Sequence, residues 1–194
     1  MRAIPSEKEC LDMLERAGCS EKIIEHCCVV MSVAVSLARR AGVDLDLVRA
    51  GALLHDIGRS RTHGIRHMTV GADILRSFGL SESLIKITQR HIGAGLAPGD
   101  VEDLGLPPGI YHPETIEEKI VCHSDNLVDG SSIICIEDAI EDFEAKGLYS
   151  AAQRMMEIEG EISLLTGEGS DQLLREADPA SRIRGPCSAY ARRR

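Results

Sequence analysis

The sequence contains no tryptophan, and aromatic residues make up only 3% of its 194 residues. The hydrophobic residues, 43% of the chain, are therefore mostly aliphatic, a composition that suits packed helices better than a β-sandwich. Alternation of apolar and polar residues, the pattern of a half-buried strand, never lasts more than a few positions. We therefore expect an all-α protein that is long enough to bury a full core.

The chain also lacks any apolar run near the roughly 18 residues that a membrane span needs, and its N-terminal stretch is charged. A basic surplus is missing too, since the formal net charge is −9, whereas a general nucleic-acid binder normally presents a basic face. These features predict a cytoplasmic protein with no membrane contact and no stable nucleic-acid partner. A nucleotide substrate stays possible, because a few arginines and metal ions can hold a phosphate.

The seven cysteines contain no Cys-x-x-Cys spacing, and the only close pair is Cys27-Cys28. Adjacent cysteines do not readily bridge each other, so the sequence indicates neither a disulfide framework nor a zinc ribbon. We expect reduced, mostly buried thiols, as is usual in the cytosol.

Helical periodicity and capping residues predict a series of helices along the chain. The expected ranges are 5–17, 20–40, 44–55 or 46–55, 67–78, 81–91, 113–129, 136–146 and 149–165, followed by a short polar helix after Gly167. The intervening segment 92–113 holds five glycines and four prolines, too many for a helix. It is either a mobile wall over a site or a passive connector.

The most informative stretch is 51–58, in which an apolar helical run ends in the pair His55-Asp56 and Gly58 stops the helix. Burying an imidazole and a carboxylate costs several kcal/mol unless something binds both groups. A divalent metal ion is the expected partner, because imidazole nitrogen and carboxylate oxygen are both good ligands for such ions.

Further ligand-type side chains lie on the apolar sides of the predicted helices: His26, His67, His91 and Asp125. The alternative for any single buried histidine is a ring satisfied by a backbone carbonyl. Together with the His-Asp pair, however, these groups are served most simply by one centre with one or two divalent ions. The mixed donor set suits Mn, Fe, Co, Ni or Zn better than Mg alone.

The order His26, His55-Asp56, Asp125 resembles the HD superfamily of metal-dependent phosphohydrolases, and the run from His55 to Gly58 matches its HDIG form. The resemblance covers about residues 20–130 and implies an HD-domain helical bundle. It also implies that the first histidine, the His-Asp pair and the last aspartate bind one divalent ion.

Members of this superfamily with two metals carry two further histidines between the pair and the last aspartate. By resemblance these are His67 and His91, and Asp56 would bridge the two ions as the catalytic carboxylate. The stretch Glu118–Leu127 is similar to the last-aspartate helix of the two-metal hydrolases. The chain departs from many HDIG proteins in having Arg59 where they have lysine. No companion motif of the cyclic-di-nucleotide phosphodiesterases is visible, since no second histidine follows His91.

Weaker candidates surround this set. Arg59, His63 and Arg66 lie on a polar loop, where they can bind a substrate phosphate or can be ordinary solvated residues. Asp129, one turn after the last aspartate, can orient a ligand or simply cap the helix. His123 points away from the ligand face of its helix, so we expect it to be structural or exposed.

We therefore divide the chain into an N-terminal helix that packs on the core (1–19), an HD domain (20–130), a C-terminal helical extension (131–184) and a disordered basic tail (185–194). The expected function is hydrolysis of a phosphate ester, a nucleotide or dinucleotide, by metal-bound hydroxide. Arg59 would neutralise charge on the phosphate oxygens. The alternatives are a non-catalytic nucleotide-binding module, a helical interaction protein with core histidines, and an HD oxygenase.

Overall fold

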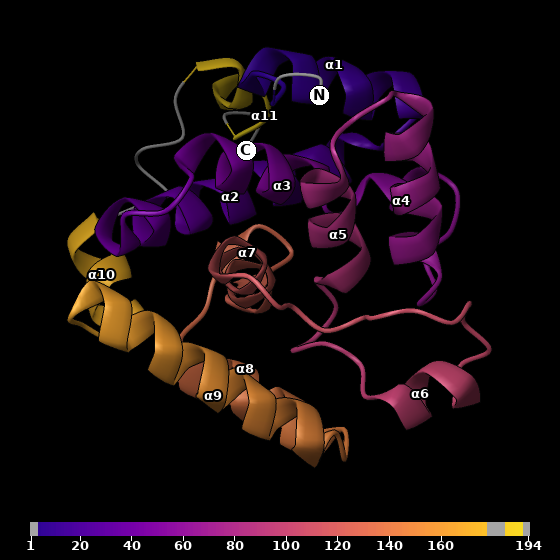
Figure 1. Cartoon of the computed structure of the whole chain (residues 1–194). Helices are drawn as coiled ribbons and strands as arrows, with labels where there is room; N and C mark the ends of the chain where they lie inside the picture. The colour runs from indigo at the N-terminus through magenta and orange to yellow at the C-terminus, as the bar shows by residue number, and fades with distance from the viewer. Residues whose placement is uncertain (1–3, 178–184, 192–194) are drawn as a thin grey trace.

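The computed structural model describes residues 4–177 and 185–191, which form a bundle of helices (Figure 1). The only named strands in these ranges are β1 (Val128–Asp129) and β2 (Ser132–Ile133), which pair antiparallel. The expectation of an all-α fold is confirmed. Within the described ranges, no helix has the combination of length and apolarity that crossing a membrane would require. The helices are α1 (Glu7–Ala17), α2 (Glu21–Ala41), α3 (Leu45–Leu54), η1 (Ile57–Ser60), α4 (His67–Ser77), α5 (Glu82–Arg90), α6 (Pro98–Asp103), α7 (Ile116–Asn126), α8 (Ile136–Ala145), α9 (Tyr149–Thr166), α10 (Ser170–Ala177), η3 (Gly185–Cys187) and α11 (Ser188–Ala191).

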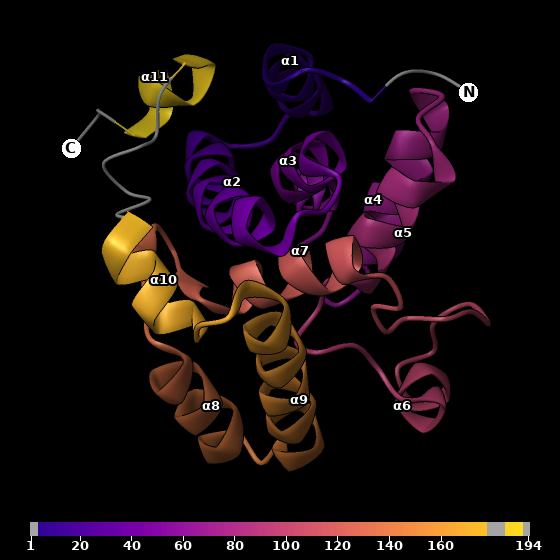
Figure 2. The same cartoon turned by 60° about the vertical axis from the view of Figure 1, so that its left-hand side comes forward.

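Helices α2 and α3 lie at the centre of the molecule, with α1 packed against α3 on one side (Figures 1 and 2). Helix α7 crosses on the opposite side of this pair, and the α8–α9 pair lies beyond it (Figure 2). Helices α4 and α5 pack against each other at one edge of the bundle. The central position of α2 agrees with its sequence, because Val30, Val33 and Leu37 are completely buried along one stripe.

Capping residues explain why the first helices begin and end where they do. Ser6 begins α1 with a capping box, in which its hydroxyl accepts from the Glu9 N–H and the Glu9 carboxylate accepts from the Ser6 N–H. Asp44 caps α3 by accepting from the Leu47 N–H. Gly42 ends α2 with a φ of 69°, a left-handed conformation that glycine adopts without strain. The bounds expected from the sequence therefore agree with the observed ones to within a few residues.

The segment 92–113 contains one helix that we did not expect, α6. Pro98 occupies its first turn, where the missing N–H of proline costs nothing. The Asp100 carboxylate accepts from the Ala97 N–H and closes this turn. The prediction of no helix in this segment is thus wrong for these six residues, while the remaining positions form loops.

The C-terminal part also differs from the expectation of a disordered tail over 185–194. The structure places residues 185–191 in η3 and α11, and Cys187 forms a disulfide with Cys28 of α2. The expectation that all thiols are reduced is therefore wrong for this pair. The two cysteines are 159 positions apart, so no local spacing indicates their contact. The last three arginines, 192–194, lie outside the described residues.

Candidate metal centre

The structure brings the predicted ligand-type side chains together where α2, α3, α4, α5 and α7 meet. In the described part of the chain, three groups of three residues have ligand atoms within 4.8 Å of one another; one of them, Cys135, Glu137 and Asp171, contains none of the predicted ligands, and the other two lie at this site. The first group comes from α2, the end of α3 and α7, and the second comes from the end of α3 and the end of α5. The groups are His26, His55 and Asp125, and His55, Asp56 and His91.

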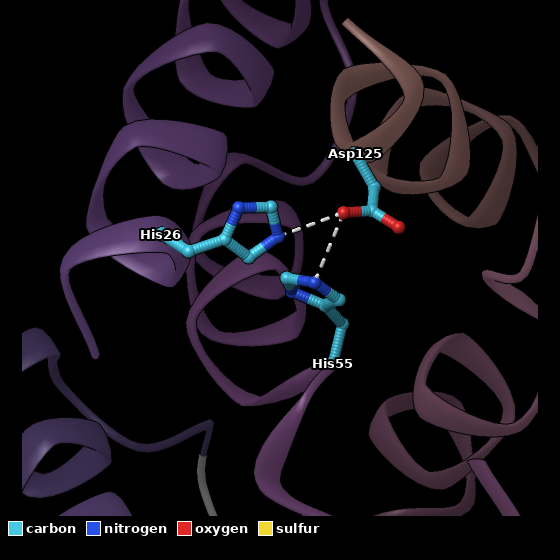
Figure 3. Close-up of side chains that lie close together, drawn as sticks. All are labelled: His26, His55 and Asp125. Carbon is cyan, nitrogen blue, oxygen red and sulfur yellow. Dashed lines mark hydrogen bonds and ion pairs between the residues drawn. The ribbon is translucent and has the colours of Figure 1, made fainter. Parts of the chain in front are cut away.

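In the first group, a single carboxylate oxygen faces two imidazoles (Figure 3). Oδ1 of Asp125 lies 2.9 Å from Nε2 of His26 and 3.3 Å from Nε2 of His55. Figure 3 shows the two rings approaching this oxygen from different elements. Asp125 of α7 thus contacts a histidine of α2 and the histidine at the end of α3.

Asp56 lies between the first group and a second pair of imidazoles. Its Oδ2 atom is 3.8 Å from Nε2 of His55 and 4.0 Å from Nε2 of His26. Its Oδ1 atom is 3.1 Å from Nε2 of His67 and 3.5 Å from Nε2 of His91. Each oxygen of this carboxylate therefore faces a different pair of histidines, and His67, which belongs to neither three-residue group, joins the site here.

Each of these histidines is fixed by its other ring nitrogen, Nδ1, which lies 2.7–2.9 Å from a backbone carbonyl. A carbonyl oxygen only accepts, so Nδ1 carries the proton and Nε2 keeps its lone pair when the ring is neutral. The Nε2 lone pairs of all the rings are consequently directed at the two carboxylates. The four contacts are His26 to Gly130, His55 to Ala52, His67 to Gly64 and His91 to Thr88.

Helix ends explain two of these contacts. His55 is the C-cap of α3 and His91 is the C-cap of α5. The carbonyls of Ala52 and Thr88 lie in the last turn of each helix, where no further helical N–H is available. The ring N–H of each histidine takes that place, so ending the helix at a histidine also orients its ring.

The electrostatics of the cluster favour a cation. Burial opposes the charge of Asp56, but the nearby imidazoles of His55, His67 and His91 outweigh it and hold its pKa well below the usual value. Burial likewise opposes the charge of Asp125, whose pKa is nevertheless lowered by the nearby imidazoles of His55 and His26. Burial alone would lower the pKa of His55, yet the two carboxylates raise it to about 9. Burial lowers the pKa of His91, which favours its neutral form.

Two buried atoms of this cluster, Nε2 of His55 and Oδ1 of Asp56, have no partner in hydrogen-bond geometry among the described residues. Leaving a buried polar atom unpaired costs about 1–3 kcal/mol. Imidazole nitrogens and carboxylate oxygens are the atoms that bind Mn, Fe, Co, Ni and Zn in proteins, and such an ion would give both unpaired atoms a partner. The residues present therefore fit a divalent metal ion.

The three predicted phosphate-binding residues differ in their contacts with the cluster. The Arg59 Nε atom donates to Oδ2 of Asp56 at 2.5 Å, so this side chain borders the site directly. His63 is exposed on the loop before α4. Arg66 is exposed as well, and its Nη2 atom donates to the Gly105 carbonyl at 3.3 Å, which ties this loop to the end of α6.

Asp129 and His123 lie on either side of the last aspartate. Asp129 is exposed in β1, and the group that orients His26 is the neighbouring carbonyl of Gly130. His123 is buried, and its Nε2 atom lies 2.8 Å from Oε2 of Glu159 and 3.1 Å from Oγ of Ser170. It thus links α7 to the C-terminal extension, in agreement with a structural role.

Sequence reasoning missed the function of Gly58, which we expected to stop a helix. Helix α3 already ends at Leu54, and Gly58 lies inside η1, where η1 packs against α4. A Cβ atom on Gly58 would lie 1.9 Å from the His67 carbonyl oxygen and 2.6 Å from the Gly71 nitrogen. The glycine after the pair therefore lets the His55-Asp56 segment approach the start of α4. The only signal in the sequence is the glycine itself.

Comparison with known sequences identifies the family of this chain and two similar proteins. The family model "HD domain" matches residues 23–128. An uncharacterised protein of Methanocaldococcus jannaschii is 53% identical over 133 residues, which cover 66% of this chain and 79% of that protein. A tRNA (cytidine(56)-2'-O)-methyltransferase of Thermoplasma volcanium is 42% identical over 173 residues, which cover 89% of this chain but 51% of the relative. The chain thus spans about half the length of the methyltransferase that it matches.

One solved structure is similar across most of the fold. The L. monocytogenes phosphodiesterase PgpH HD domain, crystallised in complex with cyclic-di-AMP, superimposes with a TM-score of 0.51. The match covers 80% of this chain and 96% of that chain at 20% sequence identity. At this identity, the likeness concerns the fold alone.

Proposed function

Since this chain belongs to the HD domain family, we propose that it is a metal-dependent phosphohydrolase that acts on a phosphate ester, a nucleotide or dinucleotide. One observation carries the proposal: imidazole Nε2 atoms from separate helices converge on the carboxylates of Asp56 and Asp125, with every Nδ1 atom bound to a carbonyl. A structural role for each histidine would need only the Nδ1 contact. The shared direction of the Nε2 atoms supports a common cation.

We assign a first ion to His26, His55, Asp56 and Asp125. A second ion would be held by His67 and His91, with Asp56 between the two as the catalytic carboxylate. The orientation of Asp56 supports this division, since Oδ2 faces the first set and Oδ1 faces the second. The metal would be Mn, Fe, Co, Ni or Zn.

Bound divalent ions supply a water of lowered pKa and neutralise negative charge on phosphate oxygens. The remaining work falls to the chain itself. The carbonyl contacts of the Nδ1 atoms prevent the four rings from rotating, so the site is ordered before a ligand arrives. Asp56 and Asp125 hold two buried negative charges at fixed positions.

Arg59 is the proposed phosphate contact. Its Nε atom stays on Asp56, while a third of its side chain is exposed. The other guanidinium N–H groups can donate to two phosphate oxygens in a geometry that lysine does not reproduce. His63 and Arg66 are proposed as outer contacts to the substrate, because both lie on the exposed loop between η1 and α4.

The methyltransferase of Thermoplasma volcanium is about twice as long as the part that matches this chain, so we propose no methyl transfer for this chain. The PgpH domain was crystallised with cyclic-di-AMP, which makes nucleotides the first substrates to test.

The test combines elemental analysis after chelator-free purification with a screen of phosphomonoesters, cyclic nucleotides and dinucleoside polyphosphates. We expect one or two transition-metal ions per chain and hydrolysis that a chelator abolishes and added metal restores. A protein that contains no metal overturns the proposal. A protein that binds metal and nucleotide without turnover would be a regulatory module, and iron-dependent oxygen uptake would indicate an oxygenase.

A further inference from the structure

A cavity of about 550 Å³ lies beside the proposed metal centre, between the segment that follows His91 and the C-terminal extension. One wall is formed by residues 92–96, a second by α6 and a third by the turn from α8 to α9. Figure 1 shows α6 set apart from the bundle on the side of the α8–α9 pair. The volume is within the range of small-molecule sites, about 300–1,000 Å³.

The cavity wall is anchored to the proposed ligand segments on two sides. Gly93 lines the cavity two residues after His91, so their Cα atoms are at most about 7 Å apart. The Gly93 carbonyl accepts from Nδ2 of Asn126 at 2.5 Å and from Sγ of Cys122 at 3.0 Å. Asn126 directly follows Asp125 in the chain. A phosphate at the metal centre would therefore have the rest of its molecule next to this cavity.

The lining combines apolar surface with polar groups at its edge. Phe143 packs close to Gly93, where a Cβ atom would lie 3.3 Å from its ring. Leu148 and Tyr149 line the cavity with side chains that are 48% and 67% exposed, so a ligand can cover them. The Arg154 guanidinium donates to the carbonyls of Ala94 and Gly95, which holds one charged group at the wall.

Carboxylates stand at the opposite wall, where Asp100 and Asp103 of α6 line the cavity. An aromatic ring, aliphatic surface and groups that donate or accept hydrogen bonds are what a planar heteroaromatic base requires. A second phosphate would be disfavoured here by the two aspartates. The chemistry of the walls therefore fits the uncharged end of a nucleotide better than its charged end.

We propose that this cavity binds the nucleoside part of the substrate, with the base against Tyr149, so that the α8–α9 turn selects the base. This proposal rests on the proposed function, because that function places the phosphate of the substrate at the metal centre. Phe143, Leu148, Tyr149 and Arg154 lie outside the part of the chain that the HD family model matches, residues 23–128. Base selection is thus assigned to the C-terminal extension and not to the part that the HD family model matches.

The test measures binding of adenosine, guanosine, cytidine and uridine by calorimetry. Nucleosides carry no phosphate, so their binding requires neither metal nor hydrolysis. Ala151 lines the cavity, and Ala151→Phe fills it, so we expect at least a 10-fold weaker Kd for the preferred nucleoside. Met156→Ala, an exposed position on the same helix outside the cavity lining, is the matched control and should bind as the wild type does.

A second variant guards against misfolding of the first. Tyr149 is largely exposed, so Tyr149→Ala should fold normally and bind the nucleoside about 5-fold or more weakly through lost stacking. The proposal is overturned if none of the four nucleosides binds the wild type, or if both cavity variants bind as tightly as Met156→Ala. Nucleoside binding without any hydrolysis of nucleotides would instead retain the cavity and overturn the proposed function.

Discussion

His67 and His91 bring their Nε2 atoms to 3.1 Å from each other, although 24 positions separate them in the chain. Both rings donate from Nδ1 to a carbonyl, so neither has a second proton to share in its neutral form. Two nitrogen lone pairs at this distance repel each other unless a positive charge lies beside both. This contact is the strongest single reason to place a second ion next to Asp56.

Asp56→Asn should remove the metal and lower hydrolysis about 100-fold or more, because the amide keeps the size of the side chain but cannot supply charge to two ions. Metal content and kcat/KM measure this effect. Asp73→Asn, at an exposed carboxylate of α4, is the control and should change neither. Wild-type activity of the Asp56 variant at full metal content would contradict the site.

His67→Ala and His91→Ala should each lower metal stoichiometry from about two towards one, because each removes one imidazole from the second set only. His112→Ala, at an exposed histidine, should keep both ions. Elemental analysis and anomalous scattering give the measurement. If the wild-type protein binds only one ion, and the imidazoles of His67 and His91 both lie far from it, the protein has one metal instead of two.

Gly58→Ala should destabilise the fold by about 2–4 kcal/mol, because its Cβ atom would meet the His67 carbonyl at 1.9 Å and must push α4 away from η1. Gly64→Ala provides the control, since a Cβ atom there meets nothing within 4 Å. Denaturant titration compares the two variants. Equal unfolding free energies would mean that the close contact relaxes at no cost.

Acid should weaken the link between α7 and the C-terminal extension. Burial opposes the charge of Glu159, but hydrogen bonds from His123 and Ser170 outweigh it and lower its pKa to about 2. The unfolded chain has the ordinary value of 4.5, so the stabilisation is complete above pH 4.5 and is lost as the pH falls towards 2. We expect Glu159→Gln to lower the free energy of unfolding by at most about 3 kcal/mol at pH 7. The unfolding free energy of this variant should also depend less on pH between 2 and 4.5. An unchanged slope of unfolding free energy against pH would contradict this role.

Reduction should destabilise the protein, because the Cys28–Cys187 disulfide closes a loop of 159 residues. Cys187→Ser is expected to lower the unfolding free energy by about 2–4 kcal/mol. Cys135→Ser, at a free and half-buried cysteine, should have little effect. Alkylation followed by mass spectrometry counts the free thiols, and seven free thiols in protein purified without reductant would show that the disulfide is absent.

The ligand-type residues and the helices could be predicted from the sequence for a physical reason. Metal chemistry restricts the residue types to histidine and carboxylate, and helical periodicity places them on buried faces, as for His26 beside Val30. Helix ends leave equally local signals, such as Ser6 and Gly42. Both kinds of information lie within a few positions of the residue concerned.

Contacts between distant segments could not be predicted in this way. The carbonyl of Gly130 orients His26 from 104 positions away, and a carbonyl is present at every residue, so its choice leaves no mark in the sequence. The approach of Gly58 to α4, the pairing of Cys28 with Cys187 and the cavity beside Gly93 all depend on the packing of whole helices. These features arise only in the folded chain.

The span of the His26 contacts has a consequence for the order of events during synthesis. Its ring meets Asp125, 99 positions later, and the carbonyl of Gly130. A ribosome adds roughly 5–20 residues per second, so α2 waits several seconds before α7 exists. Until then His26 has neither its carboxylate partner nor the carbonyl that fixes its tautomer. A nascent chain that stalls before residue 125 therefore lacks part of the proposed ligand set, and an ion bound at the proposed centre would mark a finished domain.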